Sequence, residues 1–254
     1  DDAAQALGAE INGEKAGTLG DVGILSFNKK SMSCTGGGMI VTNNTDIYGE
    51  LSNIKLQNEK LKDVYLRVAK TSLSRLFYKT DLQYLSELSN KFFEGRIGRS
   101  KNTIMLNLLS NIDAYLGLVQ LDKLEKFINK RIHNANILSD MLSSVERVKI
   151  VGYGSNHIYT RLAIIIDYGI EKKNRESILR VHDFRKYLKM KGIPTILPYI
   201  PIHMQNGFTN YRCTSLKNTQ DICYKIVNIP NSPLMKDKQV KYIATCIKNY
   251  FSKI

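Results

Sequence analysis

The sequence predicts an α/β fold, with a first domain over residues 1–145 and a small α+β domain over residues 146–254. Two observations carry this prediction. Short runs such as "DVGILSFN", "GMIVT" and "RLAIIIDYG" are rich in β-branched residues, which is typical of strands. Longer segments between them repeat apolar residues at intervals of three and four, which is typical of helices. With 254 residues, 43% of them hydrophobic, the chain can bury a core.

The first domain is expected to open with strands and turns. "EINGEKAG" places Asn12-Gly13 between two short runs, and this pair predicts a hairpin because both turn positions tolerate positive φ. "DVGILSFN" and "GMIVT" are expected to be strands on either side of a loop that carries two lysines and three glycines. From Asp46 to about Lys79 the pattern predicts helix, whose apolar residues are Leu61, Val64, Tyr65, Val68, Ala69, Leu73, Leu76 and Phe77.

A long helical tract is expected from Asn107 to about Ser144. Its predicted buried face consists of Ile112, Leu116, Val119, Leu121, Leu124 and Phe127. After Lys149 come the strand-like "KIVGYG" and "RLAIIIDYG", the helix-like "ESILRVHDFRKYLKMKG", the Pro-rich "IPTILPYIPIHM" and a last helix near Lys236 to Phe251. This order predicts the small α+β domain.

Composition narrows the class of protein. The four cysteines lack CxxC spacing, which favours a reduced, cytoplasmic setting over a disulfide framework, and no spacing of His and Cys suggests a metal site. No apolar run approaches the roughly 18 residues that span a bilayer. The net charge of +14 suits phosphorylated substrates, an anionic membrane or nucleic acid. A nucleic-acid partner is not expected, because basic and acidic residues are mixed and no RNP or zinc-finger pattern occurs.

A basic helical insert is expected at about residues 55–101. It holds eleven Lys or Arg and five Asp or Glu, and it includes the aromatic pairs Phe77-Tyr78 and Phe92-Phe93. Such a stretch could make peripheral contact with a membrane surface, or it could pack ordinarily with a solvated basic face. Both interpretations stay open.

The loop "SFNKKSMSCTGGGMIVTNN" is the strongest candidate for chemistry. Its glycines do not form a nucleotide P-loop, which would end in GK[ST] and lead into a helix. A lysine in such a loop can bind a carbonyl group covalently when its amine is deprotonated. Pyridoxal 5′-phosphate (PLP) needs a lysine of this kind, an acid at its ring nitrogen and donors for its phosphate. The chain offers Lys29 and Lys30, Asp2, and Ser26 for these roles.

The region "DDAAQALGAEINGEKAGTLGDVGILSFNKKSMSCTGGGMIV" closely resembles the cofactor-lysine region of the DegT/DnrJ/StrS family of sugar aminotransferases. Those proteins read like "EDAAxALGA", then "GxxGDxGxFSF", then a lysine and a turn ending in "GGM". "LSNIDAYLGLVQLDKLEKF", "KGIPTILPYIPIH" and "IVNIPNSPLM" resemble later segments of the same family. The resemblance implies a PLP-dependent transferase of fold type I, like aspartate aminotransferase, of which this chain holds a remnant of the large domain and the small domain.

The resemblance also implies roles for individual residues. Asp2 would pair with the ring nitrogen, Gln5 would lie beside the ring, and Ser26 would bind the phosphate. Lys30 stands nine residues before Met39, as the family lysine stands before its "GGM" methionine, and is expected to bind PLP. Counted forward from Ser26 the loop is one residue short, so Lys29 stays an alternative. Further positions are Asn107, expected at the phosphate from a partner subunit, and Tyr199 and His203, expected near the substrate.

The implied function is transamination of a nucleotide-linked ketosugar in the biosynthesis of an amino sugar for a surface polysaccharide, with glutamate as amino donor, by a homodimer with sites at its interface. Family members carry a longer segment ahead of the "EDAA" motif, so this chain is expected to be a fragment, a truncated gene product or one part of a split protein. One alternative is a truncated or degenerate, non-catalytic homologue that serves as a structural or membrane-surface partner. Another is the family's dehydratase branch, where histidine typically replaces the lysine; the lysines here argue against it.

Overall fold

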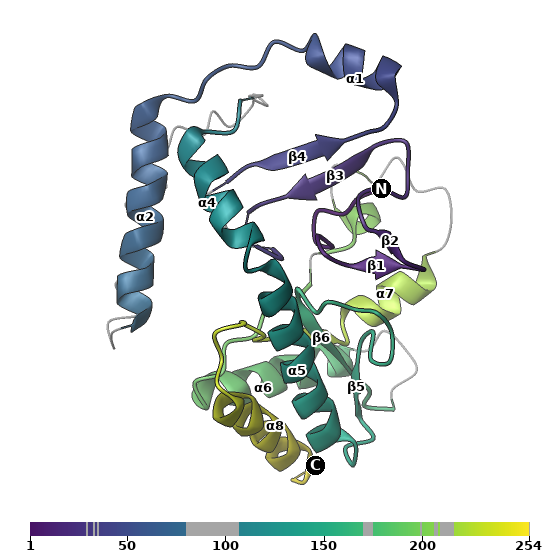
Figure 1. The fold of residues 1–254 in the computed structure, drawn as a ribbon. Coiled ribbons are helices and arrows are strands. Elements are labelled where there is room, and N and C mark those ends of the chain that lie inside the picture. The colour runs from purple at the N-terminus through teal and green to yellow at the C-terminus, as the bar shows by residue number, and fades with distance from the viewer. Residues whose placement is uncertain are drawn as a thin grey trace. The chain divides into compact units, whose positions relative to one another are not determined.

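The computed structural model describes residues 1–28, 30–32, 34, 36–79, 107–169, 175–198, 200–205, 208 and 216–253 (Figure 1). They form two compact units, Asp1–Glu125 and Lys126–Ile254. The division falls inside a helix, α5 (Leu124–Leu142), ahead of the boundary at residue 145 expected from the sequence. The physical reason is that most of α5 packs in the core of the second unit.

The first unit opens with two hairpins. β1 (Glu10–Ile11) and β2 (Glu14–Lys15) pair antiparallel around Asn12 and Gly13, whose φ angles of 53° and 86° confirm the predicted turn. β3 (Gly23–Ser26) and β4 (Gly38–Val41) form the second antiparallel pair, in a register that sets Ser26 opposite Gly38. These are the two strands expected on either side of the lysine loop.

Three helices complete the described part of the first unit: α1 (Thr45–Ser52), α2 (Leu61–Lys79) and α4 (Asn111–Leu121). α1 begins after Asn44, whose side-chain oxygen accepts hydrogen bonds from the backbone N–H groups of Asp46 (2.9 Å) and Ile47 (3.1 Å). The continuous helix expected from Asp46 is therefore wrong in one respect: residues 53–60 separate α1 from α2.

The predicted buried faces of α2 and α4 are also wrong in part. Val64 of α2 is buried, but Leu61 and Tyr65 are exposed. The tract expected from Asn107 breaks between α4 and α5 near Asp122, and Leu121 is half exposed. The residue of α4 that is most deeply buried is Asp113, a carboxylate that periodicity of apolar residues cannot indicate.

The second unit is a three-stranded antiparallel sheet covered by helices. The strand order is β5-β6-β7, with Leu162 opposite Ile229 and Val148 opposite Ile166. The elements after α5 are β5 (Val148–Ile150), β6 (Leu162–Ile166), α6 (Arg175–Met190), η1 (Ile202–Met204), α7 (Lys217–Cys223), β7 (Ile226–Ile229) and α8 (Asp237–Phe251). The predicted α+β character of this region agrees with this arrangement, although α7 and β7 were not expected.

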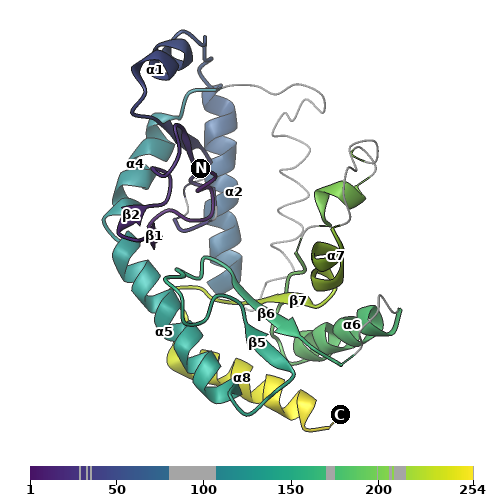
Figure 2. The same ribbon diagram turned by 90° about the vertical axis from the view of Figure 1, so that its right-hand side faces the viewer.

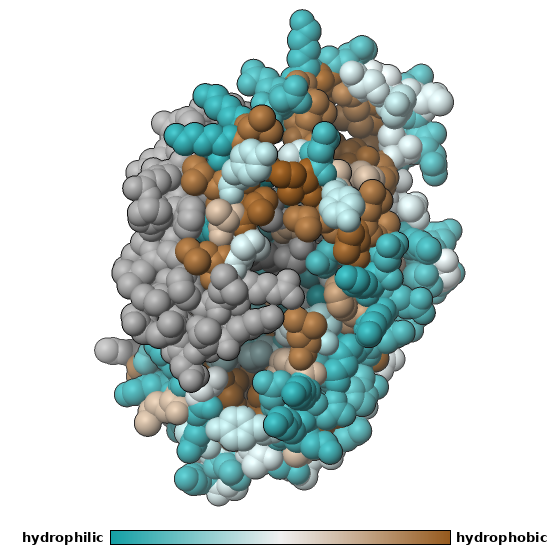
Figure 3. All heavy atoms as spheres, turned by 60° about the vertical axis from the view of Figure 1, so that its left-hand side comes forward, coloured by the Kyte–Doolittle hydropathy of each residue, from teal (hydrophilic) through white to brown (hydrophobic). Residues whose placement is uncertain are grey.

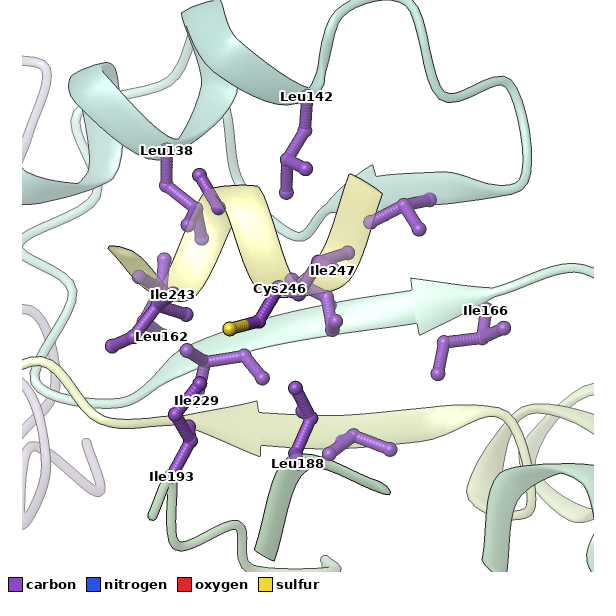
Figure 4. Packing of buried hydrophobic residues seen from close by; sticks show 14 of the residues in the cluster. Leu138, Leu142, Leu162, Ile166, Leu188, Ile193, Ile229, Ile243, Cys246 and Ile247 are labelled. Carbon is purple, nitrogen blue, oxygen red and sulfur yellow. The ribbon is translucent and has the colours of Figure 1, made fainter. Parts of the chain in front are cut away.

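A single hydrophobic core joins the sheet and helices of the second unit (Figure 4). Ile243 and Ile247 of α8 lie between the sheet and α5, with Ile243 close to Leu162. α6 contributes Phe184, which is fully buried, with its ring centroid 5.1 Å from that of Tyr250. Apolar residues at the expected helical spacing therefore hold this unit together.

Among the described residues, no helix is long and apolar enough to cross a membrane.

We expect Phe184→Ala to lower the free energy of unfolding of the second unit by about 3–5 kcal/mol, because it removes a large buried ring and leaves a cavity. Leu179→Ala on the exposed side of the same helix is the matched control and should change stability little. Urea unfolding followed by far-UV circular dichroism measures both. Equal losses in the two variants would contradict the assignment of this core.

Candidate functional site

The lysine loop between β3 and β4 is closed by backbone hydrogen bonds. Phe27 N–H donates to the carbonyl of Gly37 (3.0 Å), and Cys34 N–H donates to the carbonyl of Phe27 (2.9 Å). Lys30 lies half-buried in this loop, and its N–H donates to the carbonyl of Met32 (3.0 Å). The alternative lysine, Lys29, lies outside the described residues. The loop thus leaves the hairpin beside Ser26 and returns to it at the glycines.

Helix α4 packs against the buried side of the lysine loop. Met32 and Cys34 are buried, and Gly117 of α4 faces them: a Cβ built there would lie 3.5 Å from Cys34 Sγ and 3.7 Å from Met32 Cε. Burial raises the pKa of the Cys34 thiol, and the nearby carboxylate of Asp113 raises it further. Cys34 therefore fills space as a neutral thiol, and we assign it no catalytic role.

Asp2 and Ser26 come from neighbouring strands. Asp2 forms a parallel bridge with Ile24, and Ile24 N–H donates to the carbonyl of Asp1 (2.9 Å). Bridged residues point their side chains to the same face of a sheet, and so do residues two apart along one strand. Asp2, Ile24 and Ser26 therefore share one face. Asp2 is exposed, and one of its carboxylate oxygens accepts a hydrogen bond from Ala4 N–H (3.1 Å).

Two glycines allow this packing of backbones. A Cβ on Gly23 would lie 1.8 Å from the carbonyl oxygen of Gly17, so only glycine lets β3 approach the segment that follows Asp2. A Cβ on Gly38 would lie 2.6 Å from the carbonyl oxygen of Leu25, and Gly38 stands opposite Ser26. Glycine at position 38 therefore lets β4 approach the backbone of β3 closely beside Ser26.

An apolar hollow runs along the same hairpin. Ile24, Gly38 and Ile40 line it together with Asn107 and Leu108. Figure 3 shows hydrophobic side chains gathered in the upper part of the view, at the height of α1 and β4 in Figure 1. Asn107 is exposed and pairs with Gln57 in a parallel bridge. The structure therefore brings Asn107 to the hairpin that carries Ser26.

The other predicted site residues are placed as follows. Gln5 is exposed in the turn after Asp2. His203, in η1 of the second unit, is half-buried with its Nε2 3.1 Å from Nε2 of Gln220 in α7. Tyr199 lies outside the described residues. Within the described part of the chain, no three His, Cys, Asp or Glu side chains are grouped as metal ligands would be.

A buried ion pair beside the loop was not predicted. Arg67 Nη2 of α2 donates to Asp113 Oδ2 of α4 (2.6 Å), and its Nη1 donates to Glu59. Ser110, the N-cap of α4, donates to the same Asp113 oxygen (2.6 Å) and accepts from Asp113 N–H (3.1 Å). The Asp113 side chain is only 2% exposed, and its carboxylate is held by hydrogen bonds from Arg67 and from the Ser110 hydroxyl.

The ion pair also contacts the glycine run of the lysine loop. A Cβ built on Gly36 would lie 3.7 Å from the guanidinium carbon of Arg67. Burial lowers the pKa of Arg67, but the hydrogen bonds and charges of Glu59 and Asp113 outweigh burial and raise it. Arg67 belongs to the stretch expected as a basic insert, yet it faces inward. The pattern Ser110-x-x-Asp113 before an apolar run was the available sequence signal for the cap.

We expect Arg67→Met to lower the free energy of unfolding of the first unit by about 3–5 kcal/mol, because it leaves the Asp113 carboxylate buried without its cation. Arg67→Met combined with Asp113→Leu should recover most of this loss. Lys130→Met, which breaks the exposed Lys130–Asp237 pair (2.6 Å), is the control and should have little effect. Urea unfolding measures all three, and an equally stable Arg67→Met protein would refute the inference.

The sequence of this chain matches a known protein family and several of its members. Residues 1–248 match the model of the DegT/DnrJ/EryC1/StrS aminotransferase family. The chain is 26% identical over 256 residues to GDP-perosamine synthase of Vibrio cholerae; the match covers 100% of this chain and 59% of that protein. The chain therefore spans less than two thirds of the length of this relative.

Solved structures agree on the fold. Helicobacter pylori PseC, an aminotransferase involved in the biosynthesis of pseudaminic acid, matches with a TM-score of 0.71 at 16% identity, over 100% of this chain and 59% of that one. GDP-4-keto-6-deoxy-D-mannose-3-dehydratase of E. coli, with bound hydrated PLP, matches with a TM-score of 0.67 at 18% identity, over 96% and 59%. The chain has the fold of the corresponding parts of these proteins, and it belongs to the DegT/DnrJ/EryC1/StrS aminotransferase family.

Proposed function

We propose that the protein transfers an amino group to a nucleotide-linked ketosugar, with PLP as cofactor and glutamate as amino donor. One observation carries the proposal: the Asp2–Ile24 bridge sets a carboxylate and the Ser26 hydroxyl on one face of a hairpin, and Lys30 lies in the loop that leaves this hairpin. An acid, a hydroxyl and a lysine are the groups that PLP requires. Family membership supports the same assignment.

Asp2 and Ser26 would hold the two ends of the cofactor. The Asp2 carboxylate would accept a hydrogen bond from the ring nitrogen and keep it protonated, so that the ring withdraws electrons from the reacting carbon. Ala4 N–H donates to one Asp2 oxygen and thereby fixes its orientation. The Ser26 hydroxyl would donate to the phosphate, while its oxygen accepts a hydrogen bond from Asn28 N–H (3.4 Å). One anchor would thus come from β3 of the hairpin and the other from the segment bridged to it at Ile24.

Lys30 would bind the cofactor covalently and, once displaced by the donor, move a proton as a general base and acid. Its loop is closed by the Phe27–Gly37 and Phe27–Cys34 hydrogen bonds and rests on α4. A loop held at both ends restricts the positions that the amine can take. Lys29 remains the alternative for this role.

The remaining residues would act around this centre. Gln5 would lie beside the ring, Asn107 would contact the phosphate, and Tyr199 and His203 would lie near the substrate. Asn107 reaches the hollow beside Gly38 within this chain. We propose a homodimer, because Ile24 and Ile40, which stand opposite each other on this hairpin, are half exposed and could be covered by a partner subunit.

The substrate class follows from the relatives. The match to GDP-perosamine synthase supports a nucleotide-linked sugar as substrate. The chain has 37 basic and 23 acidic residues, and this excess of positive charge is compatible with the pyrophosphate of such a sugar. An amino sugar would be the product.

The proposal is tested by adding PLP to the protein, reducing with borohydride and mapping the modified peptide by mass spectrometry. We expect one adduct on Lys30, lost in Lys30→Ala and kept in Lys29→Ala. If Lys29 is the cofactor lysine, the two variants exchange their behaviour.

Lys15→Ala, in the exposed β2 strand, is the matched control and should keep the adduct.

Asp2→Ala should weaken PLP binding, measured by the visible absorbance of the bound cofactor. Labelling spread evenly over surface lysines, or unchanged in the variant without Lys29 and Lys30, would refute the proposal.

A further inference from the structure

The net positive charge of the chain comes entirely from its second unit. Residues 126–254 contain 22 Lys or Arg and eight Asp or Glu, a difference of +14, which equals the net charge of the whole chain. Residues 1–125 contain 15 of each kind. The candidate cofactor residues Asp2, Ser26 and Lys30 lie in the neutral unit, so binding of the cofactor does not account for this asymmetry.

Two neighbouring helices carry much of this charge. Residues 175–191, which include α6, hold six basic and two acidic side chains, and residues 236–253, which include α8, hold five and one. α6 and α8 pack side by side (Figures 1 and 2), and the Tyr242 hydroxyl of α8 donates to the carbonyl of Lys191 (3.1 Å). Their buried sides enter the same core. Their exposed sides therefore form one surface.

This surface is apolar as well as basic. On α6 the exposed residues Leu179, Lys186 and Met190 are seven and four apart, which places them on one stripe of the helix. The exposed carboxylate of Asp183 lies on the same stripe, four positions after Leu179 and three before Lys186. Leu179 is 53% exposed and Met190 79% exposed. We call Leu179, Lys186 and Met190, together with Lys238, Lys241 and Tyr242 on α8, the α6–α8 face.

A pocket at the edge of α6 adds a site for an anionic group. Lys186 and Lys189, both exposed, line it with Arg185 and Thr195. Arg185 Nε donates to the Thr195 hydroxyl (3.2 Å), which fixes the guanidinium at the wall of the pocket. Two mobile ammonium groups beside an oriented guanidinium are suited to a phosphate group.

We propose that the α6–α8 face binds the surface of an anionic phospholipid bilayer, with the α6 pocket taking a headgroup phosphate. Lysines of the face would be attracted to anionic lipids, and Leu179, Met190 and Tyr242 would enter the region between headgroups and acyl chains. Exposed aliphatic side chains favour a lipid surface over nucleic acid, whose phosphate backbone offers them nothing to contact. The proposed membrane contact thus lies in the second unit, and contact through the basic stretch 55–101 stays a separate prediction.

Co-sedimentation with vesicles tests this inference. The full chain should pellet at low salt with phosphatidylcholine vesicles that contain phosphatidylglycerol, should stay in solution with pure phosphatidylcholine, and should be released by high salt. Equal binding to the neutral vesicles, or no pelleting with the anionic ones, would overturn the proposal.

Variants locate the surface. Lys186→Glu with Lys241→Glu should lower the partition coefficient about tenfold or more, since each basic residue near the membrane contributes about 1 kcal/mol. Lys149→Glu with Lys217→Glu makes the same change in net charge at exposed positions of β5 and α7, and should cost less than about threefold. Equal losses in the two pairs would show diffuse attraction by net charge and overturn the assignment to this face.

A third pair separates lipid from nucleic acid. Leu179→Ser with Met190→Ser should weaken vesicle binding while leaving the affinity for duplex DNA unchanged. The proposal fails if this pair leaves vesicle binding intact, or if DNA binds more tightly than anionic vesicles at the same salt concentration.

Discussion

The first unit depends on the close parallel approach of β3 to the segment that contains Asp2. The Asp1 carboxylate accepts hydrogen bonds from Gly17 N–H (2.5 Å) and Leu19 N–H (3.3 Å), and Gly23 lies against the Gly17 carbonyl where no Cβ could fit. This contact brings the Asp2 side chain to the face of Ser26. The proposed cofactor site therefore requires glycine at positions 23 and 38, where a Cβ would collide with neighbouring backbone.

The lysine loop depends on a second constraint, the buried carboxylate of Asp113. The hydrogen bond from Arg67 to this carboxylate ties α2 to the start of α4, and the two hydrogen bonds between Ser110 and Asp113 cap that helix. α4 then packs Gly117 against Met32 and Cys34 in the loop. A charge that is costly to bury is tolerated here because it is fully paired. The ion pair between Arg67 and Asp113 stabilises the helices that pack against the lysine loop, and it is not itself part of the proposed cofactor site.

The sequence predicted the local structure where a single short-range rule governs it. The Asn12-Gly13 turn, the two strands around the lysine loop, α6 and α8 follow from turn chemistry and periodicity, and family membership was visible in the linked motifs around Lys30. What failed depended on contacts between distant residues. The inward orientation of Arg67 requires Asp113, 46 positions away, and no periodic pattern encodes that pairing.

The same limit applies to the helix boundaries. The tract from Asn107 to Ser144 reads as one helix by spacing, but it divides at Asp122 because its two halves pack in different units. Surface chemistry was also only partly readable. The net charge of +14 was plain in the composition, whereas the pairing of Leu179 and Met190 with lysines on adjacent helices requires the fold.

The position of α5 bears on how the protein can be dissected. The boundary between the compact units falls after Glu125, two residues into the first turn of a helix that runs from Leu124. A recombinant second unit that starts at Lys126 would lose that turn and its first backbone hydrogen bonds. Starting a few residues upstream, before Asp122, keeps the whole helix and its N-terminus, and so gives the isolated domain a better chance of independent folding.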